Sequence, residues 1–181
     1  FQNIAASADT LTKPQRERLL QSFKSLLPRY NRDEQLLVGI GLLLQQQSNF
    51  DEAMTYADKA LTTYPRSIPA AILEANLLHE LKRDREAIAK MADLLTFYPD
   101  NISLRNQYAH ILTHYDLALA QQQFAIIAKQ QPKNADAVLS LGIIAMERKD
   151  YKAADKAFEK LLDTDTHSST GHYYVGRLAE A

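Results

Sequence analysis

The stretch ADAVLSLGIIAMERKDYKAADKAFEKL, residues 135–161, carries the pattern that decides the fold of this chain. Leu141 and Gly142 stand side by side in its first half, and Ala154 and Phe158 follow four positions apart in its second half. Large and small residues at such spacings mark one face of a helix, and small residues allow a second helix to approach closely. The stretch therefore predicts two helices that pack against each other.

The same pattern recurs at a fixed interval along the sequence. Ile40 and Gly41 repeat the Leu-Gly pair, and Pro65, Pro99 and Pro132 close successive blocks, 34 and then 33 residues apart. A period of this length is typical of a solenoid, in which supersecondary units stack because none can bury its apolar face alone. Such arrays are typical of binding scaffolds and not of catalysts.

Each block predicts a first helix, a short turn and a second helix. Apolar residues fall three and four apart over residues 34–47, which is the period of one helix face. Asn49, with Glu52 three residues later, predicts a capping box at the start of the second helix. Pro65 ends that helix, because proline has no N–H and disfavours helix at the residue before it. The residues expected to cap the following first helices are Ser67, Asn101 and Asn134.

The composition excludes several classes of function. Lys and Arg total 21 against 22 Asp and Glu, and the net charge of −1 gives no long-range attraction to nucleic acid or anionic lipid. The 181 residues include no cysteine, which removes disulfides and thiolate metal sites. No apolar run reaches the length that crosses a bilayer. We therefore expect no nucleic-acid partner and no direct membrane insertion of this chain.

The pattern resembles the tetratricopeptide repeat family, which places large, apolar, small and aromatic residues at set positions of a 34-residue unit. In the block 135–168 these positions are held by Val138, Leu141, Gly142, Ala145, Tyr151, Ala154 and Phe158. The blocks at 34 and 68 depart from the pattern at Ala57, Glu74 and Asp84. The resemblance implies an all-α fold, a right-handed superhelical solenoid of antiparallel helix pairs.

In this register the chain is a single array of repeats. Its parts are a partial repeat at 1–33, repeats at 34–67, 68–101, 102–134 and 135–168, and the first helix of a truncated repeat at 169–181. The third full repeat is one residue short, and two registers compete there: Ala120 with Phe124, or Ala118 after Tyr115. We favour the first, because it keeps a large residue four positions after the alanine. Since the array stops inside a repeat, we expect a fragment of a longer protein.

The resemblance assigns ligand binding to the concave surface formed by the first helices. In this sequence the groove residues are Val38, Leu42, Gln45, Ile72, Leu73, Asn76, His79, Asn106, His110, Leu139, Ile143, Met146, Tyr173 and Arg177. Their mixed apolar and amide character suits a helix or an extended peptide of a partner protein. The apolar members have an equally good alternative as core residues, because apolar residues at helical spacing usually pack against neighbouring helices.

One subclass of the family is disfavoured. Members that bind chaperones hold the terminal carboxylate of a peptide with Lys and Arg on the first helices, together with asparagines. This sequence keeps only Asn76 and Asn106, so no cation is placed to offset the desolvation of a carboxylate.

Catalytic and metal sites have weak support. His110 and His114 are four apart on one predicted helix, and the register directs His79 toward the same groove, so three imidazoles could hold zinc. Hydrogen-bonding histidines that line a groove are the favoured interpretation, because no HExxH motif and no spaced carboxylate accompany them. No phosphate loop, nucleophile elbow or triad spacing occurs either. We expect neither a metal, nor a cofactor, nor enzymatic activity.

Glu74 and Arg105 occupy positions at which the family pattern has apolar residues, on first helices of adjacent repeats. We predict that they form a partly buried ion pair. The alternative is that both charged groups reach solvent along their aliphatic stems.

Two further functions differ from peptide binding. The helix over 169–181, with Tyr173 and Leu178, offers a face for self-association. The strings Leu104-Arg105, Gln123-Phe124 and Tyr173 to Arg177 are similar to bacterial cell-envelope repeat lipoproteins that present substrates to a carboxyl-terminal processing protease. That resemblance implies an adaptor role, and it favours the bacterial periplasm, with an outer-membrane-anchored parent, over the cytoplasm.

Overall fold

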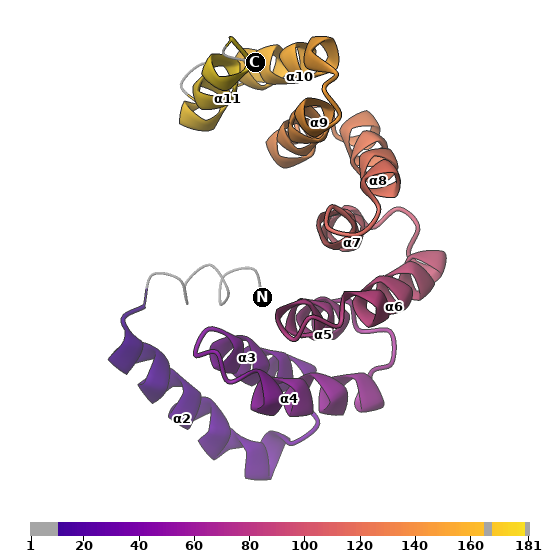
Figure 1. Ribbon diagram of the computed structural model, residues 1–181. Coiled ribbons are helices and arrows are strands. Elements are labelled where there is room, and N and C mark those ends of the chain that lie inside the picture. The colour runs from indigo at the N-terminus through magenta and orange to yellow at the C-terminus, as the bar shows by residue number, and fades with distance from the viewer. Residues whose placement is uncertain (1–10, 165–167, 180–181) are drawn as a thin grey trace. The chain divides into compact units, whose positions relative to one another are not determined.

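The computed structural model describes residues 11–164 and 168–179, which form ten helices and no strand (Figure 1). The helices are α2 Lys13–Tyr30, α3 Glu34–Gln45, α4 Phe50–Thr63, α5 Ile68–Glu80, α6 Asp84–Phe97, α7 Ile102–Leu112, α8 Leu117–Gln130, α9 Ala135–Glu147, α10 Tyr151–Thr164 and α11 Ser169–Ala179. The predicted all-α fold is confirmed. Residues 1–10, 165–167 and 180–181 lie outside the described residues, so the predicted repeat boundaries near them stay a prediction.

The chain separates into two compact units, Phe1–Tyr98 and Pro99–Ala181, called here the N-terminal unit and the C-terminal unit. Within each unit every helix packs against the next one along the chain, and α3 also contacts α5. The helix pairs α3–α4, α5–α6, α7–α8 and α9–α10 fall inside the four predicted repeats. No helix in the described ranges is both long and apolar enough to cross a membrane.

Side-chain caps begin the first helices where the sequence predicts them. The side chains of Ser67, Asn101 and Asn134 accept hydrogen bonds from backbone N–H groups three residues later. The capping box predicted for α4 is not formed: Asn49 Nδ2 donates to Glu52 Oε2 at 2.8 Å, and the Asn49 side chain accepts no backbone N–H. The carboxylate of Glu52 is drawn instead to Lys24 Nζ, 2.6 Å away on α2, because the ammonium is a stronger partner than a neutral amide N–H.

A left-handed residue closes three of the first helices. The residues with positive φ are Ser48, Lys82 and Lys149, at 59°, 62° and 59°. Next to each, a backbone N–H reaches back five residues, as Asp150 N to Ala145 O does at 2.9 Å, and satisfies a free carbonyl at the helix end. The described turn between α7 and α8 has no such residue. Ala120 and Phe124 are buried and Ala118 is exposed, which agrees with the favoured register for this shorter repeat.

The core of each unit lies between first and second helices. In the N-terminal unit Leu37, Ile40 and Leu44 pack with the alanines of α4 and with Leu73 and Leu77 of α5. A Cβ atom at Gly41 would lie 2.5 Å from Leu73 Cδ2, so the glycine makes room for the leucine. In the C-terminal unit the fully buried ring of Phe158 stacks on Tyr174, with 5.1 Å between ring centroids. The packing within these helix pairs fixes the positions of the first helices. It therefore also fixes where the first helices present their side chains to solvent.

Candidate functional site

In the N-terminal unit the structure divides the predicted groove residues into surface and core. Leu42 and Gln45 on α3 and Ile72, Asn76 and His79 on α5 keep part of their surface accessible to solvent. Leu42 also packs against the core, whereas Ile72 does not belong to the core cluster. We call the solvent-facing sides of α3 and α5 the first-helix face of this unit.

Two predicted groove residues of this unit are core residues, which corrects the prediction for them. Val38 is 2% exposed and Leu73 is 0% exposed. Leu73 fills the space that Gly41 leaves at the contact of α3 and α5. Helical spacing alone does not separate these residues from their accessible neighbours, because the boundary depends on how closely the helices approach each other. Neither side chain offers surface to a ligand.

His79 forms a short hydrogen bond inside the N-terminal unit. Its Nδ1 lies 2.6 Å from Asp84 Oδ1 at the start of α6, and the Asp84 side chain is only 14% exposed. This contact ties the end of α5 to the beginning of α6. The imidazole therefore has a structural role beside any contact it makes with a ligand.

In the C-terminal unit a polar cluster links α7 to α9. Asp136 Oδ2 accepts hydrogen bonds from Asn106 Nδ2 at 2.7 Å and from His110 Nε2 at 2.9 Å. The His110 ring meets Phe124 edge-on, with 5.0 Å between ring centroids. The hydrogen bond from His110 holds the pKa of Asp136 below its usual value, with smaller contributions from Asn106 and from the charge of His110, while partial burial opposes them.

The lowered pKa of Asp136 gives a prediction for acid stability. A carboxylate with a depressed folded-state pKa stabilises the fold above its unfolded value of about 3.9, and this contribution is lost as the pH falls through the folded-state pKa. We expect Asp136→Asn to lower the free energy of unfolding by less than about 1 kcal/mol at pH 7, because the side chain is 46% exposed. Urea titrations at several pH values should show the difference from wild type shrinking below about pH 4. An unchanged difference at pH 2 would contradict this assignment.

The remaining predicted residues lie on α9 and α11. Leu139 and Met146 are partly buried and pack against the cluster around Phe158. Ile143 between them keeps accessible surface and is not part of that cluster. On α11, Tyr173 is 59% exposed and Arg177 is exposed. The first-helix face of this unit, made by α7, α9 and α11, is thus apolar at its centre and polar at the Asp136 cluster.

Glu74 and Arg105 have other partners than the prediction gave them. Glu74 is 5% exposed and pairs with Lys90 of α6, inside its own repeat. Arg105 donates to Gln123 Oε1 and to the carbonyl oxygen of Pro99, both within the C-terminal unit. The prediction correctly placed a buried charge at position 74, and the partner that the structure gives this charge is Lys90 of the same repeat. A flexible lysine on the paired helix reaches the carboxylate more easily than a residue of the next repeat.

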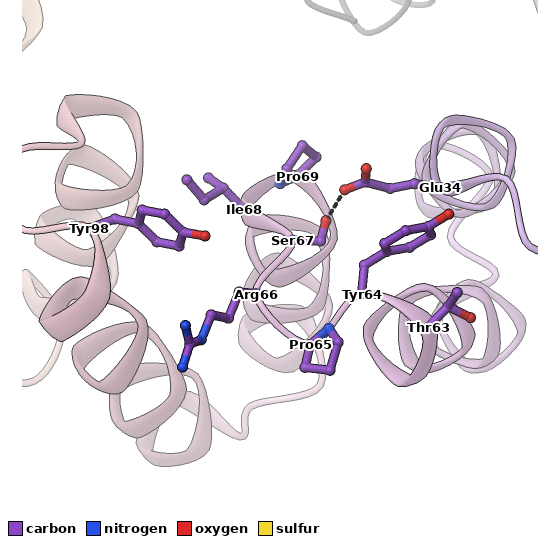
Figure 2. Close-up of a pocket in the computed structure, with 9 residues that line it drawn as sticks. All are labelled: Glu34, Thr63, Tyr64, Pro65, Arg66, Ser67, Ile68, Pro69 and Tyr98. Atoms are coloured by element: carbon purple, nitrogen blue, oxygen red, sulfur yellow. Dashed lines mark hydrogen bonds between the residues drawn. The ribbon is translucent and has the colours of Figure 1, made fainter.

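A pocket in the N-terminal unit was missed by the sequence reasoning. It has a volume of about 770 Å³, and its walls come from the start of α3, the α4–α5 turn, the start of α5 and the end of α6 (Figure 2). Its lining residues are Glu34, Thr63, Tyr64, Pro65, Arg66, Ser67, Ile68, Pro69 and Tyr98. Ser67 Oγ donates a hydrogen bond to Glu34 across one side of it (Figure 2). The available signal was a tyrosine repeated every 34 residues, at Tyr30, Tyr64 and Tyr98.

The described residues offer no metal centre. Over 11–164 and 168–179, no group of three or more His, Asp or Glu side chains is placed to hold a metal ion. His79 and His110, two of the three histidines considered for zinc, are each within hydrogen-bond distance of one carboxylate, Asp84 and Asp136.

Known proteins with the same architecture are numerous. A TPR repeat-containing protein of Pseudomonas aeruginosa is 36% identical over 109 residues, which are 60% of this chain and only 18% of that relative. Among solved structures, a thermophilic TPR protein of Thermus thermophilus aligns over 99% of both chains with a TM-score of 0.78 and 11% identity. A tetratricopeptide repeat protein of Parabacteroides merdae aligns over 99% of this chain and 72% of its own, with a TM-score of 0.78 and 19% identity. YrrB, a TPR protein with an unusual peptide-binding site, aligns over 94% of this chain and 89% of its own, with a TM-score of 0.68 and 19% identity.

Likeness to those structures shows the fold, and the sequence shows the family. The tetratricopeptide repeat model matches residues 37–102 and 113–169, which is more than half of the chain. These matched ranges contain α4, α5, α6, α8, α9 and α10, most of α3, and the small residues Gly41 and Gly142 at the helix contacts. The chain belongs to the tetratricopeptide repeat family.

Proposed function

We propose that this chain is a non-enzymatic scaffold that binds a peptide or helix of a partner protein on its first-helix faces. The observation that carries the proposal is the accessible apolar surface of Ile72 and Ile143. Ile72 lies on a first helix outside the core cluster of the N-terminal unit, with the amide of Asn76 four residues further along that helix, and Ile143 lies on a first helix outside the cluster around Phe158. An apolar anchor with polar neighbours suits an amphipathic helix or an extended segment.

The comparisons support the class of ligand but not its identity. Repeats of this family generally serve as protein-interaction scaffolds, and one structural relative, YrrB, is a TPR protein with an unusual peptide-binding site. The chain spans 18% of the length of its curated Pseudomonas relative, so the activity of a longer protein is a separate question.

Isoleucine-to-glutamate variants test the proposal. We expect Ile72→Glu and Ile143→Glu each to weaken capture of the bound partner from a lysate of the source organism more than about tenfold, because a buried apolar anchor would become a charge. Quantitative mass spectrometry of the captured proteins measures the effect. Ile126→Glu is the matched control, since Ile126 is 37% exposed on α8, a second helix.

The outcomes separate the possible locations of the site. Loss of the same partner in both groove variants, but not in Ile126→Glu, supports binding on the first-helix faces. Equal capture of the partner by all three variants would contradict binding on the first-helix faces. Thermal melting of each variant excludes unfolding as the cause of a loss.

Self-association through α11 is a second candidate. Tyr173 exposes 59% of its surface and meets Tyr174 edge-on at 5.2 Å, which leaves an aromatic side chain for another copy to cover. Sedimentation at rising concentration should then show a dimer that Tyr173→Ser weakens. A monomer at about 100 μM, a concentration that populates any dimer of micromolar affinity, would reject this function.

The adaptor role for an envelope protease is a finer form of the first proposal. The bacterial relative is consistent with a bacterial setting. If the wild-type chain captures a protease, and Ile72→Glu and Ile143→Glu do not, the adaptor role is supported. If the wild-type chain captures only other proteins, the result contradicts the adaptor role.

A further inference from the structure

One edge of the N-terminal unit gathers exposed aromatic rings. Tyr30 at the end of α2 is 48% exposed, Tyr64 directly after α4 is 42% exposed, and Phe97 at the end of α6 is 48% exposed. Tyr64 and Tyr98, the residue after Phe97, line one pocket together with Glu34, and Tyr30 lines a second pocket together with Asp33. Large apolar side chains gathered in this way indicate an interaction surface, whereas scattered ones need no explanation.

Three arginines accompany these rings. The Arg66 guanidinium lies over the Phe97 ring, 4.0 Å from its centroid, and that of Arg29 lies 5.8 Å from the centroid of Tyr30. Arg32, in the turn between α2 and α3, is exposed. None of the three forms an ion pair with an acidic side chain of the described residues. Guanidinium groups held against aromatic rings are fixed in position while their N–H donors stay free for a ligand.

The acidic groups of this edge are already engaged. Asp33 accepts a hydrogen bond from Leu36 N at 2.8 Å, as the cap of α3. Glu34 accepts one from Ser67 Oγ (Figure 2). Both donors are neutral, so the two carboxylates keep their charges. Three arginines, Arg29, Arg32 and Arg66, outnumber them on this edge, and its charge balance is therefore positive, although the chain as a whole has a net charge of −1.

The edge is also hollowed on both sides of the start of α3. The pocket of about 770 Å³ lies on one side, where Figure 2 shows Tyr98, Ile68 and Arg66 around one part of it. A smaller pocket of about 320 Å³, lined by Leu26 and Tyr30, lies on the other side. Neighbouring residues, Asp33 and Glu34, line the two pockets, so one extended segment can occupy both. Such hollows accept aliphatic or proline side chains next to a charged contact.

We propose that this edge is a second docking surface, and that it binds an acidic, extended segment of a partner protein. We call it the aromatic edge and define it by Tyr30, Tyr64, Arg66, Phe97 and Tyr98. Arginine forks bind carboxylates in two-point contacts, and the aromatic walls bury the apolar residues between them. The aromatic edge is formed by helix ends and turns, and it is separate from the side chains of the first-helix faces.

Selection from a display library of random 12-residue peptides against the whole chain tests the proposal. We expect the enriched peptides to be acidic and to contain aliphatic or proline residues. For the most enriched peptide, labelled and measured by fluorescence anisotropy, Arg66→Glu should weaken binding about tenfold and Tyr64→Ala several-fold. Arg85→Glu is the matched control, because it makes the same charge change at an exposed arginine near the start of α6. It should change affinity less than about twofold.

Each outcome decides the proposal. Acidic peptides that discriminate Arg66→Glu from Arg85→Glu support it, and Ile72→Glu should leave their binding unchanged, which separates this surface from the first-helix face. Neutral or basic peptides, equal losses in both arginine variants, or no enrichment would overturn it. The last measurement is binding to vesicles of phosphatidylcholine with phosphatidylserine. If the chain binds these vesicles but no peptide, and Arg66→Glu abolishes the binding, the edge is a lipid-binding surface and the proposal is also overturned.

Discussion

Replacing Gly142 with alanine is expected to lower the free energy of unfolding by about 2 kcal/mol, although alanine is the better helix former. A Cβ atom at position 142 would lie 2.4 Å from Cε1 of Phe158 and within 3.0 Å of two further atoms of the same ring. The ring is fully buried and stacks on Tyr174, so it has no free space to move into. Overpacking of this kind costs up to about 3 kcal/mol, and the gain in helix propensity of about 1 kcal/mol offsets only part of it.

Gly176 provides the matched control, because it holds the same repeat position on α11. A Cβ atom there would meet nothing within 4 Å. Gly176→Ala should therefore show the propensity gain alone and raise the free energy of unfolding by up to about 1 kcal/mol. The two variants make the same chemical change at equivalent positions, so only their surroundings distinguish them. Urea unfolding followed by circular dichroism measures both.

A second substitution tests the cause. If the clash with the ring is responsible, Phe158→Leu should lose stability by itself and should also reduce the cost of Gly142→Ala when the two are combined. Equal costs of Gly142→Ala in both backgrounds would show that Phe158 is not the obstacle. If Gly142→Ala alone is as stable as wild type, the helices can move apart at this contact.

The fold could be predicted from the sequence because the same signals recur in successive repeats. Small residues at Gly41 and Gly142, prolines after the second helices and polar caps before the first helices all recur at one interval, and every copy indicates the same helix pair. An unclear signal in one repeat can therefore be interpreted from the same signal in its neighbours. In the short third repeat the sequence left two registers open and favoured Ala120 with Phe124, and the burial of both residues agrees with that choice.

The site was less predictable because it depends on distances between helices. Leu73 and Ile72 are neighbours in sequence with similar side chains, yet one fills the space beside Gly41 and the other reaches solvent. Helix periodicity places both near the groove, and only the packing separates them. The large pocket combines the ends of several helices, so no single segment of sequence displays it.

The partner of Glu74 leads to the other large prediction. We expect Lys90→Met to lower the free energy of unfolding by about 2 kcal/mol, because the variant leaves a buried carboxylate without its cation. Breaking a fully buried pair costs about 3 to 5 kcal/mol, but the Lys90 side chain is 52% exposed, so water already screens part of this interaction. Lys59→Met is the matched control: Lys59 is exposed on α4 and forms no ion pair among the described residues. It should change stability by less than about 0.5 kcal/mol.

The double variant Glu74→Leu with Lys90→Met tests two alternatives. Either the ion pair adds net stability to the fold, or it only offsets the cost of burying the Glu74 carboxylate. The family pattern has an apolar residue at position 74, and the site lies between α5 and α6, where a leucine can pack against its neighbours. With both charges removed, the desolvation cost of the carboxylate disappears together with the ion pair. We therefore expect the double variant to be at least as stable as wild type in urea unfolding, even though Lys90→Met alone is destabilised. A double variant that loses as much as Lys90→Met would show instead that the ion pair contributes net stability to this repeat.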